Sequence, residues 1–141
     1  MKRILASLLL LGTIFSCFTL TSAVEIEPFR ASLTLSRYSA DLFSGSSKGK
    51  VTVSYDVRAS KPASSVGVES ISFYTEDGNF VASVSGTTSN GLVCTDTMLH
   101  GGDYEYSLPS GEYYYAKVTV FAIADGAYDS RTVTTSTVWV R

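Results

Sequence analysis

The sequence predicts an all-β protein, an antiparallel two-sheet sandwich of about seven strands that follows an N-terminal signal peptide. Three observations support this prediction. From Phe29 onward apolar and polar residues alternate with a period of two, and β-branched and aromatic residues are frequent. No stretch of ten residues keeps the helical spacing of apolar positions. Turn residues recur about every ten residues, which is the spacing typical of a sandwich.

The start of the chain has the layout of a secretory signal. A basic beginning precedes an apolar run from Ile4 to about Phe18, and small residues lead up to Ala23. The run is too short to span a membrane, which takes roughly 20 mostly apolar residues. We therefore expect a signal peptide at 1–23, cleavage after Ala23, and a secreted single domain at 24–141. The alternative is a lipid anchor on Cys17.

Composition argues against several classes of function. The formal net charge is -2 and no run of like charges occurs, so nothing in the charge pattern favours nucleic acid or an anionic membrane as a partner. After cleavage Cys94 is the one cysteine that remains in the sequence. No intramolecular disulfide is then expected, and Cys94 is interpreted as a small buried hydrophobe.

The first predicted strands are Phe29–Ser36 and Lys50–Ala59. The second is the clearer, because alternate residues form an apolar face that consists of Val51, Val53, Tyr55 and Val57. One core face and one solvent face are typical of antiparallel sheets. The segments Ser44–Gly49 and Lys61–Ser65 are rich in turn residues and are predicted to be loops.

A hairpin is predicted around Asp77-Gly78, since this dipeptide lies between two alternating segments. A two-residue loop pairs Ile71 with Val84, Phe73 with Ala82 and Thr75 with Phe80 on one face, and Ser72 with Ser83, Tyr74 with Val81 and Glu76 with Asn79 on the other. The hydrophobic pattern and the turn chemistry agree on this register.

After a loop at Ser85–Gly91, short strands are predicted at Leu92–Thr97 and Tyr104–Leu108. The strongest strand is Glu112–Ala124. Its alternation places one set of side chains inward, namely Tyr114, Ala116, Val118, Val120 and Ala122. The opposite face includes Tyr113, Tyr115 and Phe121.

A turn at Asp125-Gly126 leads into a predicted last strand at about Ser130–Val140. Its phase is left open by the pattern. An even loop directs Val133, Thr135, Thr137 and Trp139 to the core, whereas an odd loop or a bulge directs Thr132, Thr134, Ser136, Val138 and Val140 there.

The run Leu108-Pro109-Ser110-Gly111-Glu112-Tyr113-Tyr114 resembles the part of fibronectin type III domains in which a leucine and a proline precede a tyrosine. In that family the tyrosine lies six residues after the leucine, as Tyr114 lies after Leu108. The resemblance covers about Lys50–Val140 and implies an immunoglobulin-like sandwich. It also implies that Leu108 and Tyr114 are architectural, with the Tyr114 hydroxyl bonded to upstream backbone in a tyrosine corner.

The chain departs from that family at Tyr55, where a tryptophan is usual, and at Pro109, which comes one place early. In outline the chain is also similar to small exported bacterial proteins of unknown function. Neither resemblance carries a function with it.

Groups that could support catalysis or bind a metal are sparse. His100 is the sole histidine, and His100–Asp103 is predicted to be an exposed loop. A histidine-based metal cluster or catalytic triad is therefore not expected. A calcium site at Asp125–Asp129 matches no known loop spacing, so these aspartates are interpreted as turn residues. We expect no enzymatic activity, no cofactor and no metal.

Outward aromatic residues are the most suggestive feature. Tyr113, Tyr115 and Phe121 share one strand face, and Tyr74 belongs to a neighbouring strand. Such rings can stack on a sugar or anchor a protein, although strand propensity alone also accounts for them. The sequence thus favours a secreted binding module for a protein or a glycan. The alternative is a structural or assembly subunit of an extracellular or envelope complex that pairs sheet edges.

Overall fold

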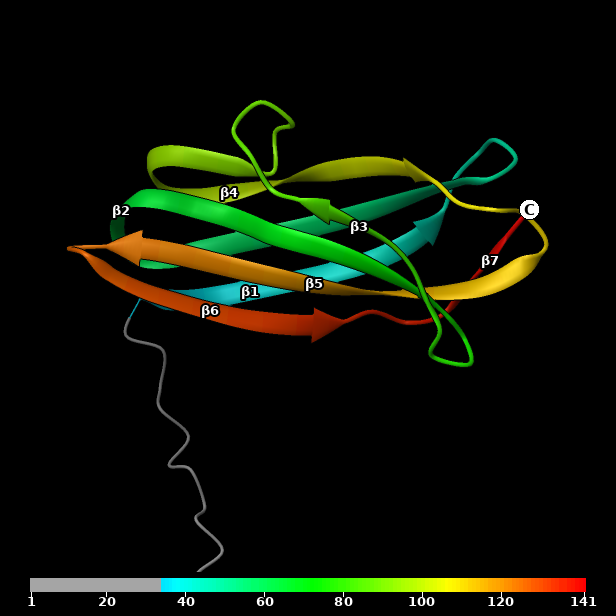
Figure 1. Cartoon of the computed structure of the whole chain (residues 1–141). Coiled ribbons are helices and arrows are strands. Elements are labelled where there is room, and N and C mark those ends of the chain that lie inside the picture. Colours follow the sequence, from blue (N-terminus) through cyan, green and yellow to red (C-terminus); the bar gives the residue numbers. More distant parts are fainter. Residues whose placement is uncertain (1–33) are drawn as a thin grey trace, which may run out of the picture.

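The computed structural model describes residues 34–141, which form β-strands and no helix (Figure 1). No helix that could cross a membrane is therefore found among these residues. The strands are β1 (Leu35–Ser44), β2 (Lys50–Thr75), β3 (Phe80–Ser85), β4 (Val93–Ser107), β5 (Glu112–Ala124), β6 (Ala127–Thr134) and β7 (Val138–Val140).

Three predictions fall wholly or partly outside the described residues. They are the signal peptide at 1–23, the lipid anchor on Cys17, and most of the strand at Phe29–Ser36. The predicted end of that strand at Ser36 is wrong, because β1 continues to Ser44. Its inward residues Ala40 and Leu42 are buried.

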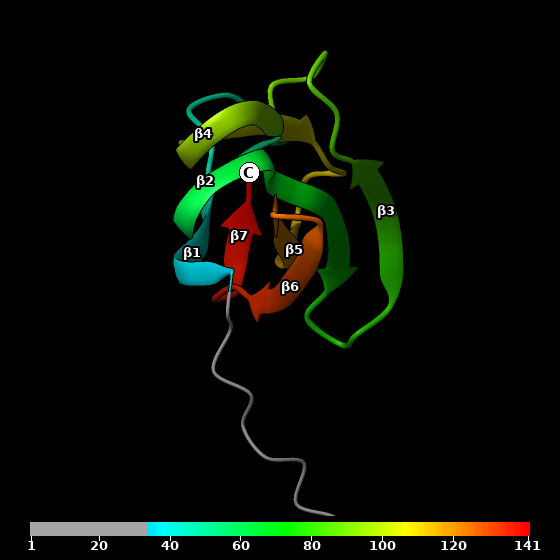
Figure 2. The ribbon, with the colours of Figure 1, turned by 90° about the vertical axis from the view of Figure 1, so that its left-hand side faces the viewer.

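The seven strands form one antiparallel sheet that is strongly curled, like half of a barrel (Figure 1). The order is β1-β2-β5-β6, with β3 and β4 paired to β2 and β7 paired to β5. Seen along the strands in Figure 2, the sheet curves around its own interior and β3 stands at one side. The all-β class and the count of seven strands are confirmed, whereas the predicted division into two sheets is not shown.

The long strand β2 explains why the strands stay in one sheet. Its first part pairs with β1 and β4, and its last part pairs with β3 and β5. The loop predicted at Lys61–Ser65 is wrong, since the strand runs through it. Pro62 lies where the register with β4 shifts, between Arg58 and Ala63. A proline lacks the N–H that a ladder needs, so the irregularity lets the strand bend without ending.

The strand β4 is also continuous where two short strands were predicted. The segment His100–Asp103, predicted to be an exposed loop, lies within β4 and pairs with β2. Gly101 lies opposite Asp56 and Gly102 opposite Tyr55. Glycine is depleted in strands, which is why this segment reads as a loop in the sequence.

The predicted hairpin is confirmed in its inner half. Three predicted pairs are present: Ile71 with Val84, Ser72 with Ser83, and Phe73 with Ala82. Nearer the turn the register shifts and Tyr74 pairs with Phe80, so the predicted partners of Thr75 and Tyr74 are wrong. The Thr75 N–H donates to the Asn79 carbonyl at 2.9 Å, which closes a turn longer than two residues. The shift places Phe80 beside Tyr74.

The last part of the chain combines both predicted phases. A tight turn at Asp125 and Gly126, both with positive φ, pairs Ala124 with Ala127 and gives β6 the even phase. The strand then ends at Thr134, and β7 begins only at Val138. In β7 the odd phase holds: Val140 is buried and Trp139 is 44% exposed. The single predicted strand at Ser130–Val140 is therefore two strands.

The core lies inside the curl and is mainly aliphatic. Its fully buried side chains include Val51, Val53, Val57, Val66, Val68, Ile71, Phe73, Leu92, Val118, Val120 and Val140. The buried face predicted for Lys50–Ala59 is confirmed by Val51, Val53, Tyr55 and Val57. Alternate residues of the same strands form the outer face, on which the candidate site lies.

Candidate functional site

Five aromatic side chains on the outer face of the sheet form the candidate site. They come from four strands and are called here the aromatic row: Phe80, Tyr74, Tyr115, Tyr113 and Trp139. Tyr74 pairs with Phe80 across β2 and β3 and with Tyr115 across β2 and β5. Tyr113 pairs with Trp139 across β5 and β7. Directly opposed residues in antiparallel strands point to the same face, so the pairing itself aligns the rings.

The rings of the aromatic row contact one another. The centroids of Tyr74 and Tyr115 are 5.4 Å apart, and the rings are stacked at 14°. Phe80 meets Tyr74 edge-on at 5.8 Å, and Trp139 meets Tyr113 edge-on at 4.9 Å. These separations lie in the range of favourable aromatic pairs, about 4.5–7 Å. Tyr113 and Tyr115 are two residues apart on β5, which joins the two groups into one row.

Much of the row is open to solvent. Phe80 is 60% exposed and Tyr113 46%, while Tyr74 and Tyr115 are half-buried where they stack. Large apolar rings gathered in one exposed place are unusual, because single scattered ones are the norm on a soluble protein. The row therefore offers a preformed aromatic surface whose rings pack in two groups, one of Phe80, Tyr74 and Tyr115 and one of Tyr113 and Trp139.

Three of the four predicted site residues lie in this row: Tyr74, Tyr113 and Tyr115. Phe121 does not, and its predicted exposure is wrong, since it is only 8% exposed. Its ring packs at 6.2 Å against Tyr128 of β6, and in the ladder it lies opposite Gly67, which has no side chain. The neighbouring tyrosine covers a ring that alternation correctly directed outward.

Two members of the row were not predicted. Phe80 was assigned to the same face as Ile71 and Phe73, which is the buried face in the structure, and Trp139 was left open. In both cases one local irregularity sets the face, namely the register shift in the hairpin and the break between β6 and β7. The Asp77-Gly78 signal did not indicate the three-residue loop between Thr75 and Asn79 that produces the shift.

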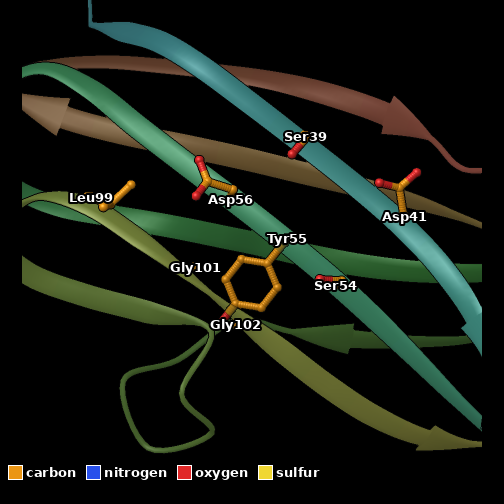
Figure 3. Close-up of a pocket in the computed structure, with 8 residues that line it drawn as sticks. All are labelled: Ser39, Asp41, Ser54, Tyr55, Asp56, Leu99, Gly101 and Gly102. Carbon is orange, nitrogen blue, oxygen red and sulfur yellow. The ribbon is translucent and has the colours of Figure 1, made fainter.

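A shallow hollow of about 430 Å³ lies elsewhere, over β1, β2 and β4 (Figure 3). It is lined by Ser39, Asp41, Ser54, Tyr55, Asp56, Leu99, Gly101 and Gly102. Gly101 and Gly102 have no side chain to fill the space at this point, and the Tyr55 ring lies beside them (Figure 3). Within residues 34–141 no group of three or more His, Cys, Asp or Glu could hold a metal ion.

His100 is engaged by structural partners. Its Nε2 atom lies 2.7 Å from the Gly91 carbonyl oxygen and 3.2 Å from the Tyr55 hydroxyl. That hydroxyl also donates to the Gly91 carbonyl at 2.9 Å. Burial raises the pKa of Tyr55, and the Asp103 carboxylate adds to the effect. The cluster ties the end of the β3–β4 connection to the sheet.

The aspartates considered for a calcium site bind different partners. Asp125 pairs with Lys61, whereas Asp129 pairs with Arg131 at 2.8 Å and accepts from the Leu35 N–H at 3.3 Å. Asp125 lies in the turn, as interpreted, whereas Asp129 lies within β6, so its interpretation as a turn residue is wrong. Cys94 is a free thiol and is half-buried, so it is not the fully buried hydrophobe that was expected.

The residues of the implied tyrosine corner are buried. Leu108 is 5% exposed and Tyr114 1%, and the Tyr114 hydroxyl donates to the Pro109 carbonyl at 3.0 Å. This is an upstream backbone bond of the kind that the resemblance implies. Burial, followed by the Glu112 carboxylate, raises the pKa of Tyr114.

Comparison with known proteins assigns no family. No protein-family model matches the chain, and no curated protein sequence matches it. Among solved structures, the crystal structure of a family 76 glycoside hydrolase from a bovine Bacteroides thetaiotaomicron strain matches at a TM-score of 0.42 and 15% identity. The match covers 74% of this chain and 20% of the hydrolase, so this chain corresponds to about a fifth of that protein's length.

Proposed function

We propose that this protein is an exported, non-enzymatic module that binds a glycan through the aromatic row. The observation that supports the proposal is the alignment of five exposed or half-exposed rings across four strands. A pyranose ring has an apolar face of C–H groups and a rim of hydroxyls. Tyrosine and tryptophan match it, because each combines a flat apolar surface with a polar tip.

The surroundings of the row favour a glycan over a protein partner. Beyond Tyr74 and Tyr115 the outer face continues with hydroxyl side chains: Ser72, Ser83, Thr119, Thr132 and Thr134. Protein interfaces generally have an apolar centre and a polar rim. Here hydroxyls lie beside the rings, where they could bond to sugar hydroxyls.

The experiment measures glycan binding by the purified protein through its own fluorescence. Trp139 is the sole tryptophan of the sequence, so its emission reports on the row without a label. We expect oligosaccharides that bind to shift or quench this emission. Tyr115→Ala should weaken binding about tenfold, as expected for the loss of one stacking ring.

Tyr38→Ala is the matched control, because Tyr38 is 39% exposed but lies on β1, away from the row. It should leave binding unchanged. A broad glycan array on which the protein binds nothing, or equal losses in both variants, would show that the proposal is wrong.

A second candidate function is assembly through sheet edges. Among the described strands β3 pairs only with β2, which leaves the other edge of Phe80–Ser85 open (Figure 2). An open edge can add a strand from another chain. Sedimentation at high protein concentration tests this candidate, and a monomer that co-purifies with no envelope component would argue against it.

The finer fold assignment belongs to the proposal as well. We suggest that the curled sheet is a distorted immunoglobulin-like sandwich, supported by the buried Leu108 and by the hydrogen bond from Tyr114 to Pro109. An experimental structure whose strands divide into two separate hydrogen-bonded sheets would establish it.

A further inference from the structure

Lys117 lies at the border between the aromatic row and the neighbouring hydroxyls. It follows Tyr115 by two residues on β5, so both side chains are on the outer face. Its Nζ atom is 5.1 Å from the centroid of the Tyr74 ring, which is within cation–π range. Across the ladder Lys117 lies opposite Ser72 on one side and Thr134 on the other. The Lys117 ammonium group therefore lies over the Tyr74 ring, which is part of the aromatic row.

The nearest polar side chains on this face are uncharged. Ser72 and Ser83 are 3.1 Å apart at their hydroxyls, and Thr119 and Thr132 are 3.0 Å apart. Ser72 lies opposite Lys117 on β2, and Thr119 follows Lys117 by two residues on β5. They provide hydroxyl donors and acceptors but no charge that could neutralise the ammonium.

Lys117 makes no ion pair with any residue in 34–141. Two other cations differ in this respect, since Lys61 pairs with Asp125 and Arg131 with Asp129. Glu69 is further along the same sheet, and its carboxylate accepts a 2.9 Å hydrogen bond from the Tyr128 hydroxyl. Glu76 lies at the opposite end of the row, where its N–H donates to the Tyr113 carbonyl at 3.0 Å, and it makes no ion pair with Lys117.

We propose that the glycan bound by the aromatic row is anionic, and that Lys117 selects it by binding a carboxylate or sulfate group of the sugar. This inference rests on the proposed function. A sugar stacked on Tyr74 and Tyr115 would bring its substituents close to the ammonium group. A charge-assisted hydrogen bond to a carboxylate or sulfate is stronger than one to a neutral hydroxyl, so the acidic sugar is preferred.

The experiment compares two pairs of polymers, each of which differs in one anionic group. Polygalacturonate is paired with its fully methyl-esterified form to test a carboxylate, and chondroitin 4-sulfate with desulfated chondroitin, which keeps its uronate carboxylates, to test a sulfate. The protein should bind the unesterified or the sulfated member of at least one pair about three- to tenfold more tightly, as expected for one exposed charged contact. The preference should diminish as salt is added.

Three variants locate the effect. Lys117→Met keeps the length of the side chain and should abolish the preference, while Lys117→Arg should retain it. Lys61→Met changes the net charge equally but lies at Asp125, away from the row, and should retain the preference. Circular dichroism would establish that each variant is folded.

The outcomes separate this inference from the proposed function. Equal binding of the two members in both pairs, or a preference that Lys117→Met leaves intact, would overturn the inference while glycan binding stands. If no polymer binds and the glycan array is also negative, the proposed function fails with it. A Trp139 emission that changes with protein concentration alone would instead identify a second copy of the chain as the occupant of the row, which would overturn both.

Discussion

The hydroxyl of Tyr114 donates a 3.0 Å hydrogen bond to the carbonyl oxygen of Pro109, five residues earlier in the chain. Tyr114 is buried in the core, and Pro109 lies in the connection between β4 and β5. The bond therefore fixes the path of this connection relative to the core. It also fixes the start of β5, the strand that contributes two rings to the aromatic row.

Replacement of Tyr114 by Phe should lower the free energy of unfolding by about 1 kcal/mol, because it removes the hydroxyl that lies 3.0 Å from the Pro109 carbonyl and 3.4 Å from Glu112 Oε2 and leaves the ring in place. Urea denaturation measures the change. Tyr113→Phe is the matched control, since Tyr113 is exposed on the adjacent position and its loss should stay within about 0.5 kcal/mol. Equal losses in both variants would contradict a structural role for the bond.

Alkaline pH should destabilise the fold through Tyr55 and Tyr114. Burial raises the pKa of both phenols, so the folded protein keeps protons that the unfolded chain releases near pH 10. Their contribution is fully present below the unfolded pKa and is lost as pH rises through the folded pKa. Unfolding midpoints in urea should therefore fall from about pH 10 upward, in the window set by these raised values.

The variants of the first prediction also test the pH effect. Tyr114→Phe should show a shallower fall above about pH 10, because one of the two buried phenols is gone. Tyr113→Phe keeps both and should fall as the parent does. A pH dependence that is the same for Tyr114→Phe and the parent would assign the effect to other groups.

Short-range alternation and turn residues predicted much of the fold. The bounds of β5, the inward face of Lys50–Ala59 and the inner half of the hairpin around Asp77-Gly78 all agree with the structure. Each depends on contacts between neighbours in sequence or across one turn. Local pattern and local pairing agree in these places, so the sequence alone predicts the strand bounds, the inward face and the register.

The sequence-based predictions are wrong where one extra residue changes the face to which the following side chains point, or where a strand bends. A side-chain period of two means that one extra residue inverts every face beyond it. This happened at Phe80, which the hairpin turn shifts outward, and at Trp139, which follows the break after Thr134. Pro62 marked a loop in the sequence but only bends β2. The single curled sheet follows from that bend, which a local pattern does not reveal.

In the candidate site, too, some features could be predicted from local alternation and others could not. Tyr113, Tyr115 and Tyr74 were directed outward by alternation alone, and they lie on the outer face. The covering of Phe121 by Tyr128 depends on a pairing between strands that the sequence did not assign. Alternation predicts the face of a residue, whereas the neighbours on adjacent strands decide its exposure.

Thr135 stabilises the junction between β6 and β7. Its side-chain oxygen accepts a 2.9 Å hydrogen bond from the buried N–H of Ala116, and its own N–H donates to the Ala116 carbonyl at 2.9 Å. Thr135→Val keeps the shape but leaves the Ala116 N–H unpaired. The free energy of unfolding should therefore fall by about 2 kcal/mol.

Thr135→Ser is the matched control for this change. It retains the hydroxyl and loses one methyl group, so its cost should be about 1 kcal/mol. Chemical denaturation of both variants provides the comparison. A serine variant that is as unstable as the valine variant would show that packing of the methyl group, rather than the hydrogen bond, stabilises the junction.

Gly86 ends β3 at a place where the backbone of β2 approaches closely. A Cβ atom added there would lie 1.7 Å from the Val68 carbonyl oxygen, far inside contact distance, and the Gly86 N–H is already bonded to the Glu69 carbonyl at 2.8 Å. The backbone has no room to relieve the clash without loss of that bond. Gly86→Ala should therefore destabilise the protein by about 3 kcal/mol.

Gly102→Ala is the fitting comparison, since it also adds one methyl group to a glycine that the sequence assigned to a loop. At Gly102 the nearest atom is the Tyr55 hydroxyl at 3.5 Å, an ordinary contact. Its unfolding free energy should change by less than about 1 kcal/mol, with a small gain from the reduced freedom of the unfolded chain. Thermal unfolding of the two variants distinguishes them. Similar melting temperatures would mean that β3 is not pressed against β2 as described, and that the position of Phe80 in the aromatic row would need revision.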